Sequence, residues 1–187
     1  VLVTGASRGI GRAIASAFAA EGDRLIITCS RSEQELLNFK KELEETFHTE
    51  VLASVGDISS FEYVEQLFEQ ITERFGGVDV LINNAQASAS GVTLVDHTQE
   101  QFDLALYSGL YATCYYMQAC YPYLKETEGT VINFGSGAGL FGNYGQCAYA
   151  AAKEGIRGLS RVAATEWGRD NINVNVICPL AWTTQLE

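Results

Sequence analysis

Three side chains in the second half of the sequence have the types and spacing needed to move a proton. Tyr149 and Lys153 lie four residues apart in a helix-like pattern, so their side chains share one helix face. An ammonium beside a phenol stabilises the tyrosinate, which makes Tyr149 a candidate general acid or base. Ser136 comes thirteen residues before Tyr149, directly after the run 130–135, where its hydroxyl could hold a carbonyl oxygen. A Tyr-x-x-x-Lys pair alone also occurs on ordinary surface helices, so its interpretation depends on the rest of the sequence.

A glycine-rich segment close to the N-terminus provides a second chemical feature. It lies between an aliphatic run and a helix-like pattern and reads Thr4-Gly5-Ala6-Ser7-Arg8-Gly9-Ile10-Gly11. Glycines at such a junction allow a tight turn and let the backbone approach a pyrophosphate, while the helix N-terminus offers N–H donors and a positive dipole. We therefore expect dinucleotide contacts at Gly5, Ser7, Arg8, Gly9, Ile10 and Gly11. A glycine turn that binds no ligand is the alternative.

Two arginines indicate which dinucleotide is bound. NAD-binding domains usually carry an Asp or Glu near the end of the second strand, where it accepts hydrogen bonds from the ribose 2′-hydroxyl. Here the run 24–29 is followed by Ser30-Arg31, with no acid. Arg31, together with Arg8 of the glycine loop, could bind a 2′-phosphate through the paired donors of its guanidinium group. We therefore predict NADP(H); the alternative is that either arginine is a solvent-facing charge.

These candidate residues are spaced along an alternation of short apolar runs and longer amphipathic stretches. The runs cover 1–4, 24–29, 51–54, 78–83, 130–135 and 172–178, and the helix-like stretches cover 10–21, 32–47, 60–75, 98–125 and 148–168. This alternation predicts right-handed βαβ units on a parallel sheet. Runs such as Val80-Leu81-Ile82 are apolar throughout, as in strands covered on both sides. The expected fold is α/β, a doubly wound (Rossmann) parallel sheet with helices on both faces, in a single domain over 1–187.

The stretch 98–125 is apolar on nearly every side, which is more than one face of a sheet can bury. Its apolar side chains include Leu104, Leu106, Leu110, Tyr111, Tyr115, Tyr116 and Met117. Together with the stretch 148–168, it is expected to form a subunit interface. Pro122 lies near its end, where a helix stop is expected.

Charge and composition exclude several classes of partner. With 23 acidic and 12 basic residues the formal net charge is −11, which argues against nucleic acid or an anionic membrane as a partner. No apolar run approaches the roughly 20 residues that span a bilayer, and no export signal is indicated. The 5 cysteines show no C-x-x-C spacing and the 2 histidines lie far apart. We therefore expect free thiols in a reducing cytoplasm and no metal site.

The motifs together resemble the short-chain dehydrogenase/reductase family over essentially the whole chain. The glycine loop has the family's T-G-x-x-x-G-x-G spacing, and Asn83-Asn84-Ala85 matches the start of its N-N-A-G motif. The segment from Gly145 to Lys153, with Asn173-Val174-Asn175-Val176 and Pro179 beyond, is most similar to 3-oxoacyl-[acyl-carrier-protein] reductases, and 28–31 is similar to tropinone reductases. The resemblance implies an NADPH-dependent enzyme that reduces a small-molecule carbonyl, either a 3-oxoacyl thioester or a small ketone, and forms a homodimer or homotetramer.

The same resemblance implies a role for each candidate residue. Ser136 orients the substrate, Tyr149 transfers the proton, and Lys153 binds the nicotinamide ribose and tunes Tyr149. Asp57, just past the third expected strand, matches an aspartate that hydrogen-bonds the adenine amino group; an N-cap to the following helix is its alternative. The remaining cofactor-binding positions that the resemblance implies are Ile58 and Asn84.

Three positions depart from the family's pattern, all in the nicotinamide half of the site. They are Gln86 in place of the glycine of N-N-A-G, Leu180 in place of a glycine after Pro179, and Gly109 in place of a fourth catalytic residue, an asparagine. These departures leave open a second function, that of a non-catalytic NADP(H)-binding regulator or scaffold. Family members continue into a substrate-covering segment, another helix and a last strand, so we expect such a region beyond Glu187, and a few residues before Val1.

Overall fold

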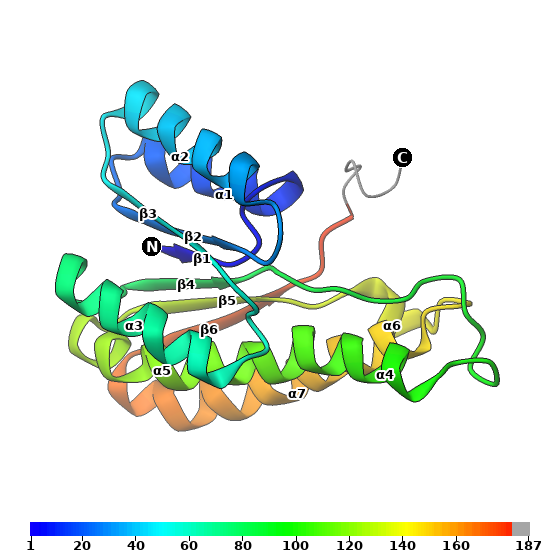
Figure 1. The fold of residues 1–187 in the computed structure, drawn as a ribbon. Coiled ribbons are helices and arrows are strands. Elements are labelled where there is room, and N and C mark those ends of the chain that lie inside the picture. The colour runs from blue at the N-terminus through cyan, green and yellow to red at the C-terminus, as the bar shows by residue number, and fades with distance from the viewer. Residues whose placement is uncertain (181–187) are drawn as a thin grey trace.

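The computed structural model describes residues 1–180 and shows a parallel sheet of six strands (Figure 1). The strands are β1 (Leu2–Val3), β2 (Leu25–Cys29), β3 (Val51–Val55), β4 (Val80–Asn83), β5 (Thr130–Phe134) and β6 (Asn173–Ile177). They lie in the order β3-β2-β1-β4-β5-β6, and every neighbouring pair is parallel. The chain winds outward from β1 to β3, returns to place β4 beside β1, and winds outward again to β6. This order confirms the expected doubly wound α/β fold.

Helices cover both faces of the sheet (Figure 1). On one face lie α1 (Gly9–Ala20) and α2 (Glu33–Phe47). On the other face lie α3 (Phe61–Phe75), α5 (Ala112–Thr127) and α7 (Cys147–Trp167). A short 3-10 helix, η2 (Gly168–Asp170), follows α7 and leads into β6.

The sheet separates two hydrophobic cores. Successive side chains of a strand point to opposite faces, so Ile26 packs with the core residues of α3 and α5, whereas Ile27 packs with those of α1 and α2. All five residues of β2 are buried. This burial on both sides is the reason that the strand is nearly uniformly apolar instead of alternating.

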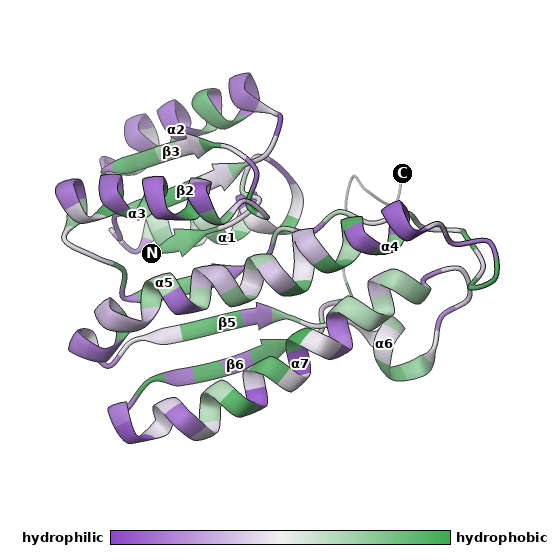
Figure 2. Cartoon of the chain, turned by 60° about the horizontal axis from the view of Figure 1, so that its bottom comes forward, coloured by the Kyte–Doolittle hydropathy of each residue, from purple (hydrophilic) through white to green (hydrophobic). Residues whose placement is uncertain are grey.

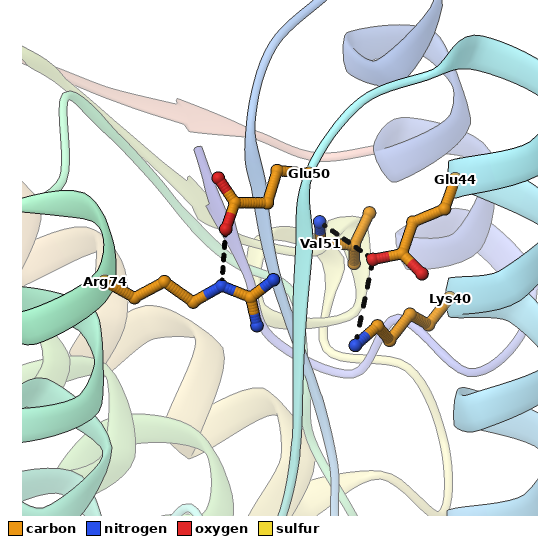
Figure 3. A network of polar contacts seen from close by, with 5 residues as sticks. All are labelled: Lys40, Glu44, Glu50, Val51 and Arg74. Atoms are coloured by element: carbon orange, nitrogen blue, oxygen red, sulfur yellow. Dashed lines mark hydrogen bonds and ion pairs between the residues drawn. The ribbon is translucent and has the colours of Figure 1, made fainter.

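Polar contacts fix the start of β3 between α2 and α3 (Figure 3). On the α3 side, Nε of Arg74 donates to Oε1 of Glu50 at 2.6 Å. On the α2 side, the N–H of Val51 donates to Oε1 of Glu44 at 3.4 Å, and Nζ of Lys40 lies 3.7 Å from the same oxygen. These side chains are partly exposed, and such ion pairs contribute only about 0–1 kcal/mol each. Their effect is to align the strand that leads to the Asp57 loop.

The helix expected over 98–125 consists of three elements. α4 (Gln99–Ala105) passes into a π-helical segment, η1 (Leu106–Tyr111), which contains Gly109 and is followed by α5. The expected stop at Pro122 is wrong, because this residue lies inside α5 and the helix continues to Thr127. π-Helical turns are rare, and they frequently occur at functional sites. The interruption therefore marks this part of the chain for closer inspection.

The apolar side chains of this region face in two directions. Tyr116 and Met117 are buried in the core beneath α5, whereas Leu104, Tyr107 and Tyr111 are 42%, 47% and 44% exposed. The rings of Tyr107 and Tyr111 stack with centroids 4.9 Å apart. An outward apolar face therefore exists, but it contains fewer side chains than the sequence suggests. Tyr116 and Met117 do not belong to it.

Candidate active site

The predicted site residues gather where β1, β4 and β5 end. β1 and β4 are neighbours in the sheet, but the chain leaves them toward opposite faces, and such a switch point is where open α/β sheets bind ligands. The glycine loop follows β1, Asn84 follows β4 and Ser136 follows β5. Tyr149 and Lys153 lie in the first two turns of α7, and Nζ of Lys153 reaches the last carbonyl of β5. Residues far apart in the sequence thus meet at one edge of the sheet.

The glycine loop is shaped so tightly that a side chain would not fit at two of its positions. Gly5 has φ +69°, and a Cβ there would lie 2.9 Å from Cβ of Ala85. A Cβ on Gly11 would overlap the carbonyl oxygen of Gly5. Gly9, with φ +58°, opens instead onto free space at the start of α1. Since the N-cap residue Arg8 makes no side-chain capping bond, the first N–H groups of α1 are available to phosphate oxygens.

Asn84 holds this loop against β4. Its Nδ2 donates to the carbonyl oxygens of Thr4 at 2.9 Å and Gly5 at 3.2 Å. In return, Oγ1 of Thr4 accepts hydrogen bonds from the N–H groups of Asn84 and Ala85, both at 3.0 Å. The amide of Asn84 therefore shapes the phosphate loop. Thr4 has the same structural task, which its place in the glycine motif does not by itself reveal.

Arg8 and Arg31 present their side chains to solvent beyond the adjacent strands β1 and β2. Within residues 1–180 neither guanidinium forms an ion pair. Arg12 differs, since it pairs with Glu42 and lies 4.0 Å above the ring of Phe39. The donors of Arg8 and Arg31 are therefore available for an anionic group.

Asp57 lies in the turn after β3, where its carboxylate is exposed. Oδ1 accepts hydrogen bonds from the N–H of Ser59 at 2.9 Å and from its hydroxyl at 2.6 Å. The N-cap of α3 is Ser60, whose hydroxyl accepts from the N–H of Tyr63. The alternative role of Asp57 as helix cap is therefore wrong. The side chain of Ile58 is buried in the core, so any contact of this residue with a cofactor must come from its backbone.

Ser136 is positioned by backbone geometry at the end of β5. Its φ of −156° continues the extended strand, and the residue caps α6 (Gly137–Phe141), a helix too short to show a periodic pattern in the sequence. Oγ of Ser136 accepts a hydrogen bond from the N–H of Ala138 at 3.1 Å. Because the hydroxyl oxygen is the acceptor in this bond, its hydrogen remains free to be donated to a substrate oxygen.

Tyr149 and Lys153 form the expected pair on one face of α7. Nζ of Lys153 lies 5.5 Å from the centroid of the Tyr149 ring and donates to the carbonyl oxygen of Phe134 at 2.8 Å. Lys153 is only 4% exposed. Burial lowers the pKa of its ammonium from 10.5 to about 8, and Cys178 opposes this shift. An ammonium held in this surrounding is a strong source of positive potential for the neighbouring phenol.

A buried chain of amides fixes α7 relative to the strands. Nδ2 of Asn83 at the end of β4 donates to Oδ1 of Asn133 in β5 at 2.8 Å. Nδ2 of Asn133 donates in turn to Oγ of Ser160 at 2.8 Å, two turns beyond Lys153 on α7. Fully paired polar networks of this kind specify one arrangement of the elements they join. The network thus connects β4, β5 and the helix that carries Tyr149.

Exposed apolar side chains border the site on the side of α6. The large side chains that are at least 76% exposed here are Leu94, Val95, Phe141 and Tyr144. The two segments that carry them are joined, since the N–H of Gly91 donates to the carbonyl oxygen of Gly145 at 2.8 Å. Figure 2 shows α6 as a largely hydrophobic helix at the end of the molecule, beside α4. We call these four side chains the apolar rim; loops and a five-residue helix gave no periodic signal for it in the sequence.

The site combines a hydroxyl donor, a phenol beside a buried ammonium and a phosphate-binding loop. Such a site can exchange a hydride with a carbonyl carbon and a proton with the carbonyl oxygen. Among residues 1–180 no three His, Cys, Asp or Glu side chains gather as metal ligands. In the same part of the chain, no helix is both long and apolar enough to cross a membrane. Fold and site thus define an oxidoreductase of the nicotinamide-dependent class.

Comparison with known proteins agrees with this class. The family model for short chain dehydrogenases matches residues 1–187, and the chain belongs to the short-chain dehydrogenase/reductase family. It is 61% identical to a 12alpha-hydroxysteroid dehydrogenase of a Clostridium species, over 98% of this chain and 72% of that protein. It is 32% identical to a 3-oxoacyl-[acyl-carrier-protein] reductase of Thermotoga maritima, over 95% and 72%. L-sorbose reductase from Gluconobacter frateurii, solved with NADPH and L-sorbose, superposes with TM-score 0.93 at 28% identity, over 98% and 70%.

Proposed function

We propose that this chain is the dinucleotide-binding and catalytic domain of an NADP(H)-dependent dehydrogenase that interconverts a hydroxyl group and a ketone on a steroid. The observation that carries the proposal is the pairing of Tyr149 with the buried ammonium of Lys153, beside the free hydroxyl of Ser136. In this proposal residues 1–187 act as one domain in the cytoplasm, within a homodimer or homotetramer.

Each of these side chains has a defined task in the reduction. When bound, the nicotinamide supplies a hydride to the carbonyl carbon. The Ser136 hydroxyl donates a hydrogen bond to the carbonyl oxygen, which polarises the bond and holds its carbon in place. Tyr149 then gives its phenolic proton to the same oxygen, completing the alcohol. Lys153 stabilises the tyrosinate that remains and is placed to hold the nicotinamide ribose; the oxidation reverses these steps.

The residues present fit a dinucleotide with a 2′-phosphate. Open space at Gly9 and the uncapped first turn of α1 suit a pyrophosphate, where a side chain would block its approach. Arg8 and Arg31 have donors that no acidic residue of the described chain occupies, and guanidinium groups match phosphate oxygens. Asp57 has one carboxylate oxygen free for the adenine amino group.

The apolar rim favours a large apolar substrate. Four exposed apolar side chains beside the site could cover a rigid hydrocarbon skeleton, whereas a small ketone or sugar would leave them in water. The 61% identity to a hydroxysteroid dehydrogenase supports the same substrate class. We therefore place a steroid ahead of the 3-oxoacyl thioester and the small ketone, which remain the alternatives. The enzyme's own substrate is then a 12α-hydroxysteroid or the corresponding ketone.

Turnover against a substrate panel tests this function. NADPH oxidation with 12-oxosteroids, other oxosteroids, a 3-oxoacyl thioester and small ketones should be fastest with the 12-oxosteroid. Tyr149→Phe should lower kcat at least about a hundredfold while NADPH still binds, because general acid catalysis contributes that much. Tyr123→Phe removes a phenolic hydroxyl near the C-terminal end of α5, is the matched control and should keep its rate. A rate for Tyr149→Phe near that of the unmodified protein would refute the mechanism.

A second function is favoured by the three departures in the nicotinamide half, Gln86, Gly109 and Leu180. It is that of an NADP(H)-binding regulator that does not turn over. Tight NADPH binding with no turnover on any member of the panel would select it.

A further inference from the structure

Two of the positions that depart from the family's pattern, Gln86 and Gly109, lie against each other in the structure. Gly109 sits in the π-helical segment η1, and its backbone is covered by the side-chain amide of Gln86, from the loop after β4. A Cβ on Gly109 would lie 2.8 Å from both Cδ and Nε2 of Gln86 and 2.9 Å from Oε1. Any larger residue at 109 must therefore displace the glutamine. The volume in which a side chain at 109 would begin is already filled by the amide of Gln86.

Hydrogen bonds tie the same loop to the same helical turn. Nε2 of Gln86 donates to the carbonyl oxygen of Ala105 at 3.4 Å. One turn further along the helix, the hydroxyl oxygen of Ser108 accepts a hydrogen bond from the N–H of Ala87 at 3.0 Å. The same hydroxyl lies 3.0 Å from the carbonyl oxygen of Ala87 and 2.6 Å from that of Leu104, to either of which it can donate. Gln86 and Ser108 together form a clamp between the loop after β4 and η1.

The amide of Gln86 is more than a space filler. Its Oε1 is fully buried and accepts no hydrogen bond from residues 1–180. A buried acceptor without a partner is unfavourable, so an apolar side chain of the same length would fill the space at lower free energy. The bond from Nε2 to the carbonyl oxygen of Ala105 is what glutamine supplies and an apolar side chain of the same length would not.

The clamped turn bears directly on the helix that carries Tyr149 and Lys153. Ala105, just before η1, packs against Ala148 and Ala152 of α7. Leu110 lies so close to Gly155 that a Cβ there would approach its Cδ2 to 2.8 Å. These contacts bracket Tyr149 and Lys153 on both sides, so a shift of the π-helical turn would move the reacting groups.

We propose that Gln86 and Gly109 are a matched pair, in which Gln86 is a positioning residue. Its amide replaces a side chain at position 109 and, with Ser108, holds η1 against α7 so that Tyr149 and Lys153 keep their reactive geometry. The inference rests on the proposed function, since its main readout is turnover.

A double-mutant cycle tests the pairing. Gln86→Gly should lower kcat about tenfold or more through loss of the clamp, and Gly109→Asn should do so through overlap with Gln86. The double variant, with the amide moved from 86 to 109, should recover to within about threefold of the original kcat. NADPH affinity should change little throughout. Leu37→Asn, at an exposed position of α2, is the control for asparagine in a helix. Effects that simply multiply in the double variant would overturn the pairing.

Gln86→Met tests whether the amide group is needed or only the volume of the side chain. We expect kcat to fall while the melting temperature stays equal or rises, because packing is kept and the unpaired acceptor is removed. Full kcat in Gln86→Met would show that the amide is not needed and would refute its positioning role. If the unmodified protein turns over none of the panel, the proposed function fails but the pairing is still measurable. In that case the melting temperature should fall in Gly109→Asn and recover in the double variant, and a failure to recover would overturn the pairing as well.

Discussion

Replacing the buried lysine should change how the stability of the cofactor-free protein depends on pH. Lys153→Met keeps the side-chain length but removes an ammonium that is 4% exposed and whose pKa burial lowers to about 8. In the unfolded chain the same group returns to an ordinary pKa of 10.5. Between these two values the unfolded state binds more protons than the folded state, so the free energy of unfolding rises with pH in this window.

The size of the effect follows from the two pKa values. Below pH 8 the ammonium is charged in both states, and its desolvation lowers stability by about 3 kcal/mol, since each pKa unit is worth about 1.4 kcal/mol. The penalty declines as pH rises toward 10.5 and the folded state holds the neutral amine. Integration gives a recovery of about 1 kcal/mol between about pH 7 and about pH 9 for the unmodified protein. Lys153→Met lacks this recovery, and its lost hydrogen bond to Phe134 adds an offset that does not depend on pH.

Urea unfolding followed by circular dichroism at several pH values measures this difference. The stability of Lys153→Met relative to the unmodified protein should be about 1 kcal/mol more favourable near pH 7 than near pH 9. Lys41→Met removes an ammonium that is 74% exposed and is the matched control, with a difference that stays constant. A constant difference for Lys153→Met as well would show that this lysine is not a desolvated cation, and the argument about its field at Tyr149 would be wrong.

Two further changes test the cofactor and the assembly. NADPH should bind at least about tenfold more tightly than NADH, or about 1.4 kcal/mol, and Arg31→Asp should erase or invert that preference in calorimetric titration; equal affinities in the unmodified protein would contradict the assignment. Tyr111→Lys, on the exposed aromatic face of η1, should shift the protein toward monomers in light scattering, whereas Leu37→Lys, 42% exposed on α2, should not. An unmodified protein that is monomeric at micromolar concentration would refute the interface.

The sequence by itself determined the features that depend on local spacing. Four residues separate Tyr149 from Lys153, and any helix places them on one face. The glycines after β1 were interpretable because a phosphate turn needs positive φ and bare backbone at fixed positions. The doubly wound order followed from alternating strands and helices, since parallel strands need long crossovers of one hand.

Tertiary structure decided the features that depend on contacts between segments. Gln86 and Gly109 lie twenty-three positions apart in the sequence, where they are separate departures, but the fold packs the side chain of Gln86 onto the backbone of Gly109. In the same way, Tyr116 lies in the core while Tyr111, from the same apolar stretch, is 44% exposed, because only one face of this region packs against the rest of the molecule. Periodicity records only which residues share a face of one regular element. Periodicity contains no information on which space the side chain of another segment already fills. At position 109, the space filled by Gln86 decides which residue can be accommodated.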